Sequence, residues 1–180
     1  MTNTTGQIEI LLNKNKLILM LIGSIGFVAT GLWFVINPPT ISHPLFGNPA
    51  LIFVTGIAAI LFFGLCAVYI TRKLPDNKPG LIIDNIGLKD NSSGVSGGQI
   101  LWSDIENISA VEIHRQKLIL LQVKNPQEYI GKQKSSFKRK MMQMNFNMFG
   151  TPLSITSNTL QIKFDELLNI LNDYLNASRQ

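Results

Sequence analysis

The sequence has few of the side chains from which disulfide frameworks, metal sites and catalytic centres are built. Its 180 residues include one cysteine and two histidines. The cysteine, Cys66, has no second cysteine to pair with, and it lies in an apolar run, where a small apolar role is expected. His43 and His114 are far apart in the chain, and no Ser-His-Asp, Cys-His or metal-ligand spacing accompanies them. We therefore expect no catalytic residues, no metal and no cofactor, which indicates a protein that is not an enzyme.

Charge is absent from two long stretches, residues 17–36 and 50–70. A helix of about 20 residues rises roughly 30 Å, the thickness of the hydrocarbon core of a bilayer. The two stretches predict a transmembrane helical hairpin over residues 17–70. None of the few polar residues inside them is ionisable, which favours an anchor over a channel or a transporter. Small residues that are expected to let the two helices pack closely are Gly23, Gly26, Gly31, Gly56, Ala59 and Gly64.

The charges that flank the hairpin predict its orientation. Lys14 and Lys16 precede the first run, and Arg72 and Lys73 follow the second, whereas residues 37–48 between the runs contain no Lys or Arg. Positively charged flanks stay in the cytoplasm. We therefore expect a multi-pass protein of the cytoplasmic (inner) membrane with both termini in the cytoplasm. Its expected parts are a cytoplasmic N-terminal segment (1–16), the hairpin (17–70), a linker (71–80) and a cytoplasmic domain (81–180).

The pattern after the linker changes to short segments of strand length. One of them, residues 118–125, is a continuous apolar run suited to a buried central strand. The chain then closes with an amphipathic helix over residues 165–176, whose apolar stripe includes Leu167, Leu171 and Leu175. Further strands are expected at 81–84, 86–90, 99–102, 106–114 and 152–156, with another possible at 160–162. This order predicts an α+β domain, a curved antiparallel sheet or barrel with a C-terminal amphipathic helix.

Short motifs along the chain carry a family resemblance. They are Gly80 to Ile83, Ile86 to Leu88, Ile100 to Ile105, Asn125 to Tyr129, Gly150 to Pro152 and Phe164 to Leu168. With two apolar runs before them, these motifs resemble the membrane-anchored bacterial pleckstrin-homology-like (PH-like) domain proteins. The resemblance implies a PH-like fold. Phosphoinositide-binding members of the wider superfamily carry several basic residues on the first two strands, whereas residues 81–90 contain Lys89 alone, so the resemblance does not extend to that ligand.

A basic, methionine-rich insertion over residues 131–150 is the remaining feature. Residues 115–140 carry eight basic side chains and one acidic one. If residues 131–150 are helical, the Met and Phe side chains pack on the domain with the lysines in solvent, or the segment contacts the membrane surface and its anionic lipid headgroups. Nucleic acid is a poorer partner, because no aromatics alternate with the basic residues on strands. The predicted contact residues are Lys132, Lys134, Lys138, Arg139, Lys140, Met141, Met142, Met144 and Phe146.

Two classes of function fit this layout. The first is a non-enzymatic binding or scaffolding module that presents a PH-like domain at the cytoplasmic membrane surface, where it recognises lipid or an unknown protein partner. The alternative is an immunity or accessory protein that acts on another membrane protein through its transmembrane hairpin. Because charge and hydropathy place the chain at a membrane but name no partner, both classes stay open at this point.

Overall fold

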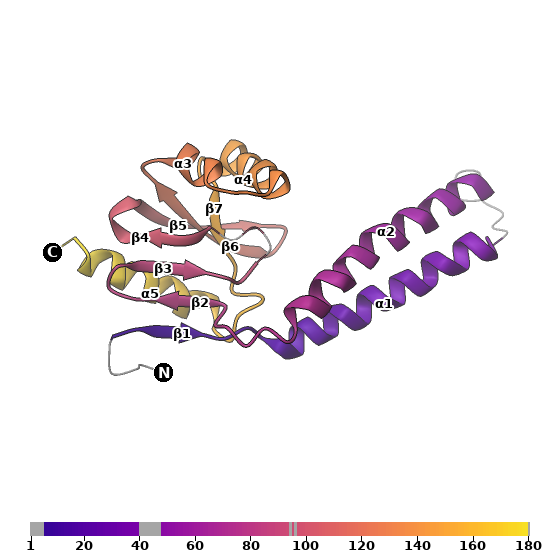
Figure 1. Ribbon diagram of the computed structural model, residues 1–180, viewed down its shortest axis with the longest axis horizontal. Coiled ribbons are helices and arrows are strands. Elements are labelled where there is room, and N and C mark those ends of the chain that lie inside the picture. The colour runs from indigo at the N-terminus through magenta and orange to yellow at the C-terminus, as the bar shows by residue number, and fades with distance from the viewer. Residues whose placement is uncertain (1–5, 40–47, 94, 96, 180) are drawn as a thin grey trace. The chain divides into compact units, whose positions relative to one another are not determined.

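The chain divides into two compact units, which are described separately. A computed structural model describes residues 6–39, 48–93, 95 and 97–179. One unit is the helical hairpin, residues 14–77, and the other combines residues on both sides of it, 6–13 and 78–179 (Figure 1). The domain is therefore discontinuous in sequence, because the hairpin is inserted near its N-terminus.

The hairpin consists of helix α1, Lys14–Ile36, and helix α2, Pro49–Lys73. The predicted runs are confirmed as helices, each extended by up to three residues at one or both ends. α2 begins where Asn48 accepts a hydrogen bond from the Ala50 N–H at 2.9 Å, with Pro49 at the first helical position. Only 11% of the most apolar window of each helix is buried within the chain. By length and composition both helices are able to cross a membrane, and their apolar surface faces outward rather than into a protein core.

The two helices approach each other most closely at a pair of glycines. A Cβ atom added to Gly31 would lie 2.9 Å from the carbonyl oxygen of Gly56, and one added to Gly56 would lie 2.8 Å from that of Gly31. Any larger residue would push the helices apart at this point. The predicted close packing is confirmed for this pair, whereas Gly23, Gly26 and Gly64 face open space.

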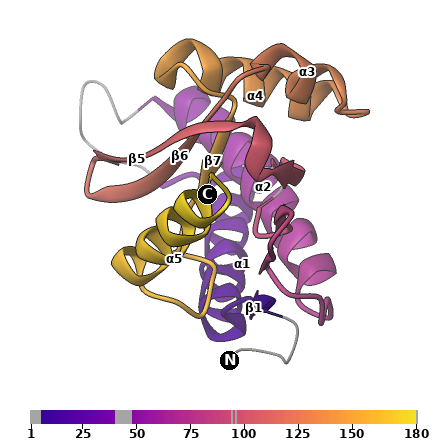
Figure 2. The ribbon, with the colours of Figure 1, turned by 90° about the vertical axis from the view of Figure 1, so that its left-hand side faces the viewer.

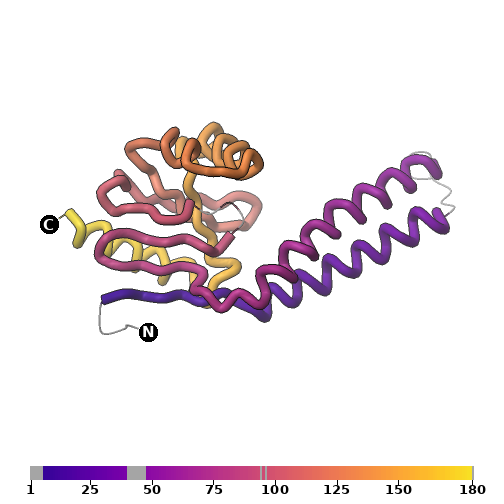
Figure 3. Tube along the Cα trace, in the orientation of Figure 1, coloured from indigo at the N-terminus to yellow at the C-terminus, as the bar shows by residue number. Residues whose placement is uncertain are grey.

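The domain begins with a four-stranded antiparallel sheet. Its strands are β1 (Ile8–Ile10), β2 (Leu81–Ile83), β3 (Gly87–Asp90) and β4 (Gly98–Leu101), and they lie in that order. β1 pairs with β2 in the register Ile10↔Leu81. The chain passes from β1 into α1 and returns from α2 to β2, as the trace in Figure 3 shows. The hairpin unit therefore takes the place of the turn between two paired strands.

Residues 1–16 were predicted to form a separate N-terminal segment. In the structure, the described residues before Lys14 belong to the domain instead. Ile10 and Leu12 are buried, with exposed fractions of 5% and 4%. Leu12 forms an isolated β-bridge with Leu160. Residues 160–162, where a further strand was possible, therefore form a single bridge and no strand. The domain boundary predicted at residue 81 is therefore incomplete, since it omits a buried edge strand.

The second sheet has three antiparallel strands, β5 (Ile105–Ile113), β6 (Gln116–Val123) and β7 (Leu153–Ile155), in that order. A short 3-10 helix, η1 (Trp102–Asp104), replaces the predicted end of the preceding strand. Among the described residues no strand pairing joins the two sheets. The predicted α+β class is confirmed as two antiparallel sheets, but the barrel is not closed.

Three helices complete the domain: α3 (Pro126–Gly131), α4 (Ser136–Phe149) and α5 (Phe164–Ala177). In Figures 1 and 2, α4 and α5 lie on opposite sides of the second sheet. α5 buries Leu167, Leu171 and Leu175, which are spaced at intervals of four residues. The predicted C-terminal amphipathic helix is confirmed, and its apolar stripe forms part of the core.

The insertion of the hairpin into a strand pair leads to a prediction about stability. Because Ile10 and Leu81 are paired, a short Gly/Ser linker from Asn13 to Lys78 is expected to replace residues 14–77 and give a soluble domain that unfolds cooperatively. A fragment that begins at Lys78 loses the buried Ile10 and Leu12 side chains. Each contributes roughly 1.5–3 kcal/mol, so this fragment is expected to be less stable by about 3 kcal/mol or more in urea unfolding. Equal unfolding midpoints for the two proteins would contradict the assignment of β1.

Candidate basic and apolar surface on α4

The basic insertion contains a well-defined helix, α4. At its start the Ser135 side chain accepts a hydrogen bond from the Lys138 N–H at 3.4 Å. At its end Gly150 adopts a left-handed conformation with φ of +75°, and its N–H donates to the Phe146 carbonyl at 2.8 Å. A serine before the helix and a glycine after it are the preferred helix boundaries. The sequence of this segment therefore sets both ends of the helix locally.

One side of α4 packs on the domain. Met142 is fully buried, and Asn145 on the same side donates a hydrogen bond to the Ser154 hydroxyl of β7 at 3.4 Å. Phe146 and Phe149 are half-buried beside them. Met142 therefore has no access to a ligand. Its predicted role in membrane contact is wrong, and its actual role is to hold the helix on the second sheet.

The outer side of α4 exposes large apolar side chains. Phe137 is 67% exposed, Met144 48% and Met148 66%. Together with the half-buried Met141 they follow helical spacings of three and four residues, so they form one continuous stripe. A soluble helix normally turns such a stripe toward its core, whereas here it faces outward.

Exposed cations lie on the same helix or just before it. Lys134, Arg139 and Lys140 are exposed, and the sequence contains no Asp or Glu between Glu128 and Asp165. The other two basic residues of the predicted contact set, Lys132 and Lys138, are less available to a ligand. Lys132 is exposed but pairs with Glu128 at 2.9 Å, and Lys138 is half-buried. We define the α4 surface as Lys134, Phe137, Arg139, Lys140, Met144 and Met148.

From the predicted contact set, the structure leaves Lys134, Arg139, Lys140 and Met144 exposed on or next to α4, and Met141 and Phe146 half-buried. Phe137 and Met148, which were not in that set, are the most exposed apolar residues of the helix. Their spacing with Met141 and Met144 was the available signal. The spacing did not reveal which of the two apolar sides of the helix is buried.

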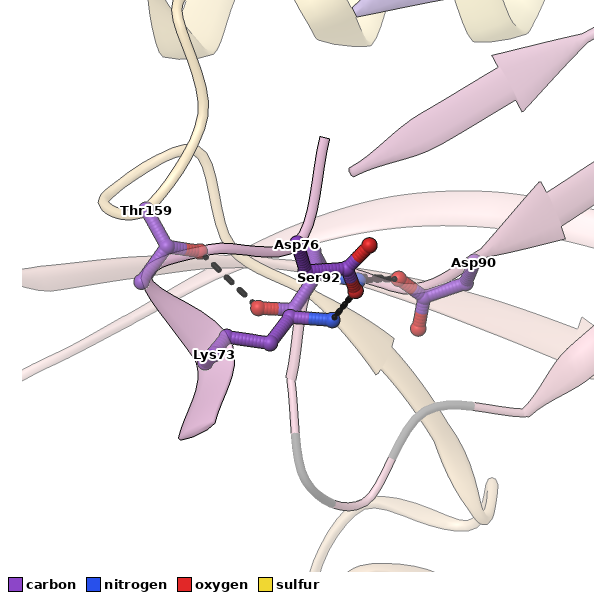
Figure 4. A network of polar contacts seen from close by, with 5 residues as sticks. All are labelled: Lys73, Asp76, Asp90, Ser92 and Thr159. Carbon is purple, nitrogen blue, oxygen red and sulfur yellow. Dashed lines mark hydrogen bonds and ion pairs between the residues drawn. The ribbon is translucent and has the colours of Figure 1, made fainter. Parts of the chain in front are cut away.

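Lys138 faces a buried carboxylate in the first sheet. Asp90 is 4% exposed and accepts hydrogen bonds from the Ser92 N–H at 2.8 Å and the Ser92 hydroxyl at 2.6 Å. The Ser92 carbonyl in turn accepts one from the Thr159 hydroxyl at 3.2 Å (Figure 4). Burial raises the pKa of Asp90, while the hydrogen bonds from Ser92 and from the Gly97 backbone and the positive charge of Lys138 oppose the increase. Because Lys138 is half-buried, it is left out of the α4 surface.

A second polar arrangement fixes α3 beside η1. The Tyr129 hydroxyl donates a 2.6 Å hydrogen bond to the Asp104 carboxylate, and burial together with that carboxylate raises the pKa of Tyr129.

The Trp102 indole N–H donates to the Asp84 carbonyl at 2.7 Å, and its ring stacks on Tyr174. Trp102 is 3% exposed, so it fills the core and offers no face for ligand stacking.

A shallow cleft of about 460 Å³ lies next to η1, lined in part by Glu106, Lys124 and Arg179. The Arg179 guanidinium donates to the Glu106 carbonyl oxygen, and these side chains are exposed. In the part of the chain that the structure describes, no three His, Cys, Asp or Glu side chains gather as a metal site would require. The α4 surface is therefore the strongest candidate site among the described residues of the domain, because it combines charge of one sign with exposed apolar side chains.

Comparison with known proteins adds no further constraint. No protein-family model, curated protein or solved structure matches this chain. The function is consequently argued from the geometry of the site and from the path of the chain.

The raised pKa of Asp90 predicts how stability depends on pH. Between the pKa of Asp90 in the unfolded chain and its higher pKa in the folded domain, the folded state binds more protons. Stability from this group is therefore present at low pH and is lost as pH rises through that window. Asp90→Asn removes the titration, so the stability of the wild type relative to this variant is expected to fall as pH rises.

Urea unfolding of the domain with residues 14–77 replaced by a linker, at several pH values from about 3 to 7, measures this difference. Lys138→Gln removes a charge that opposes the increase in pKa, and it is expected to enlarge the fall. A difference between wild type and Asp90→Asn that stays constant with pH would show that burial does not perturb Asp90.

Proposed function

We propose that this chain is a non-enzymatic binding module, anchored in the inner membrane, that presents a PH-like domain at the cytoplasmic membrane surface. The anchor is the hairpin of α1 and α2, whose lengths of 23 and 25 residues match a bilayer. The low burial of both helices supports this role, because a core helix of a soluble protein would be covered by its own chain. Two antiparallel sheets followed by the α5 helix support the PH-like domain.

The pairing of β1 with β2 is the observation that carries the proposal. β1 precedes α1 and β2 follows α2, and the two strands share one sheet. If both helices cross the bilayer, the strands meet only when the chain enters and leaves on the same side. A hairpin that crosses twice satisfies this condition, whereas a single crossing would separate β1 from β2.

The distribution of charge supports the cytoplasmic side for the domain. Lys14, Lys16, Arg72 and Lys73 lie at the ends of the helices that connect to the domain, and residues 37–48 at the other end contain no Lys or Arg. This asymmetry is the one that positive-inside orientation requires.

The α4 surface fits the inner leaflet, which is anionic. Each Lys or Arg near such a surface contributes about 1 kcal/mol, so Lys134, Arg139 and Lys140 together contribute up to roughly 3 kcal/mol. Phe137, Met144 and Met148 provide the apolar side chains that enter the headgroup region. Tethering to the bilayer raises the effective concentration of this surface near lipid, so a weak attraction is enough to orient the domain. The faces left uncovered are then available to a protein partner.

The topology is tested by labelling single cysteines in intact cells. Cys66 is replaced by alanine, and a cysteine is placed at Ser42, which lies outside the described residues, or at the exposed Gln127 of α3. The cysteine at position 42 is expected to react with a membrane-impermeant thiol reagent, and the one at position 127 only after the cells are opened. The reverse pattern would place the domain outside the cytoplasm.

Docking of α4 is tested in the full-length protein in nanodiscs. A fluorophore sensitive to polarity is attached to Met144→Cys, with Cys66 again replaced by alanine. Its emission is expected to shift to shorter wavelength in discs that contain phosphatidylglycerol, and the shift is expected to shrink at high salt. Reversing the charge of Lys134, Arg139 and Lys140 with glutamate should abolish the shift.

A matched variant controls for total charge. Arg115, Lys124 and Lys163 are exposed cations outside α4, and their replacement by glutamate changes the net charge by the same amount. This variant is expected to retain the shift. Identical emission in phosphatidylcholine and phosphatidylglycerol discs would mean that α4 stays in solvent and that its exposed stripe serves another purpose.

A further inference from the structure

A groove lies between α1 and α2 at the end of the hairpin that connects to the domain. Its volume is about 390 Å³, and it is lined by Leu21, Ile25, Ala67, Val68, Thr71 and Arg72. Ala67 leaves room for the groove because its side chain is short. The walls are apolar along most of their length, and the two polar lining residues are next to each other near the end of α2.

Arg72 differs from the other cations near this end of the hairpin. Lys73 pairs with Asp76 at 3.0 Å (Figure 4), and Lys14 donates to the Asn77 side chain at 2.7 Å. Arg72 is exposed, and within the described part of the chain it has no carboxylate partner. A guanidinium group presents a planar set of donors that matches the oxygen atoms of a phosphate. The groove therefore ends in a cation that is available to an anion.

Thr71 adds a second polar group beside this cation. Its hydroxyl donates to the Ala67 carbonyl at 2.8 Å, so its oxygen remains able to accept a hydrogen bond. The groove thus offers an apolar channel, then an acceptor, then a positive charge. A molecule that matches this order has a long apolar tail, a polar ester or hydroxyl region, and an anionic group at its end.

We infer that this groove binds one anionic glycerophospholipid, with an acyl chain against Ile25 and Val68 and the phosphate at Arg72. The inference rests on the proposed insertion of the hairpin into a membrane. Arg72 is the second-last residue of the 25-residue α2, so its side chain reaches the headgroup region when the helix spans the bilayer. The site is separate from the α4 surface, which belongs to the other unit of the chain.

The hairpin contains a natural comparison for this site. A second hollow of about 420 Å³, near the other end of α1, is lined by Ala29, Thr30, Trp33, Phe34 and Pro39. It is similar in size and also mainly apolar, but its lining has no charged residue. Lipid in this hollow would exchange freely with the bilayer, whereas lipid at Arg72 would be retained and selected by its headgroup.

Native mass spectrometry of the full-length protein tests the inference. The protein is released from nanodiscs that contain equal amounts of phosphatidylglycerol and phosphatidylcholine, and retained lipid is counted. One phosphatidylglycerol per protomer is expected. Arg72→Gln removes the cation and Ala67→Phe fills the groove, and each is expected to reduce retention at least five-fold. Ala29→Phe makes the same substitution in the uncharged hollow and is expected to leave retention unchanged.

The outcomes separate the groove from the proposed function. Retention that survives Arg72→Gln and Ala67→Phe, that falls equally with Ala29→Phe, or that shows no preference for phosphatidylglycerol would overturn the inference. Co-purified protein that is lost on Arg72→Gln would mean that a partner helix occupies the groove, and it would also overturn the inference. If the protein is absent from the membrane fraction, the proposed anchor fails as well. If it inserts but retains no lipid, only the groove inference fails. Circular dichroism of each variant confirms that the helices remain folded.

Discussion

The hydrogen bonds between β1 and β2 join two parts of the chain that are separated by the whole hairpin. Ile10 and Leu81 are partners in the sheet although two long apolar helices lie between them. The burial of Ile10 and Leu12 depends on this pairing, and so does the contact of Leu12 with Leu160 next to the last helix. The two ends of the hairpin must therefore stay together. If the hairpin enters a membrane, it can cross only an even number of times.

Periodicity in the sequence predicted the elements that are long enough to repeat. α5 was found in this way, since Leu167, Leu171 and Leu175 recur at the spacing of a helix, whereas the hairpin helices were predicted from the length of two uncharged apolar runs. β1 was missed because three residues are too few for an alternation to stand out, although Ile8, Ile10 and Leu12 do alternate. α3 was missed because it has only six residues and directly follows the predicted strand over residues 118–125, and Pro126, which is unfavourable inside a helix, occupies its first turn.

The candidate site was predicted only in part, for a different physical reason. The sequence shows which side chains of α4 share a side, but two of its sides are apolar. Met142 and Met144 differ by two positions, and one is fully buried while the other is 48% exposed. Packing of α4 against β7 determines which of the two is buried. α4 and β7 are close in sequence, but β7 is held in place by β6, which comes from an earlier part of the chain. The half-burial of Lys138 likewise depends on tertiary structure, whereas the pairing of Lys132 with Glu128 is a local contact four residues apart.

The position of β1 before α1 also affects how the protein is made. β1 leaves the ribosome before either helix, and its partner β2 follows only after both have been synthesised. The first sheet is therefore completed late, by a contact between residues that are distant in sequence. If α2 failed to insert, β1 and β2 would be left on opposite sides of the bilayer and the edge of β2 would stay unpaired. If the hairpin is a membrane anchor as proposed, pairing of β1 with β2 therefore requires that both helices insert.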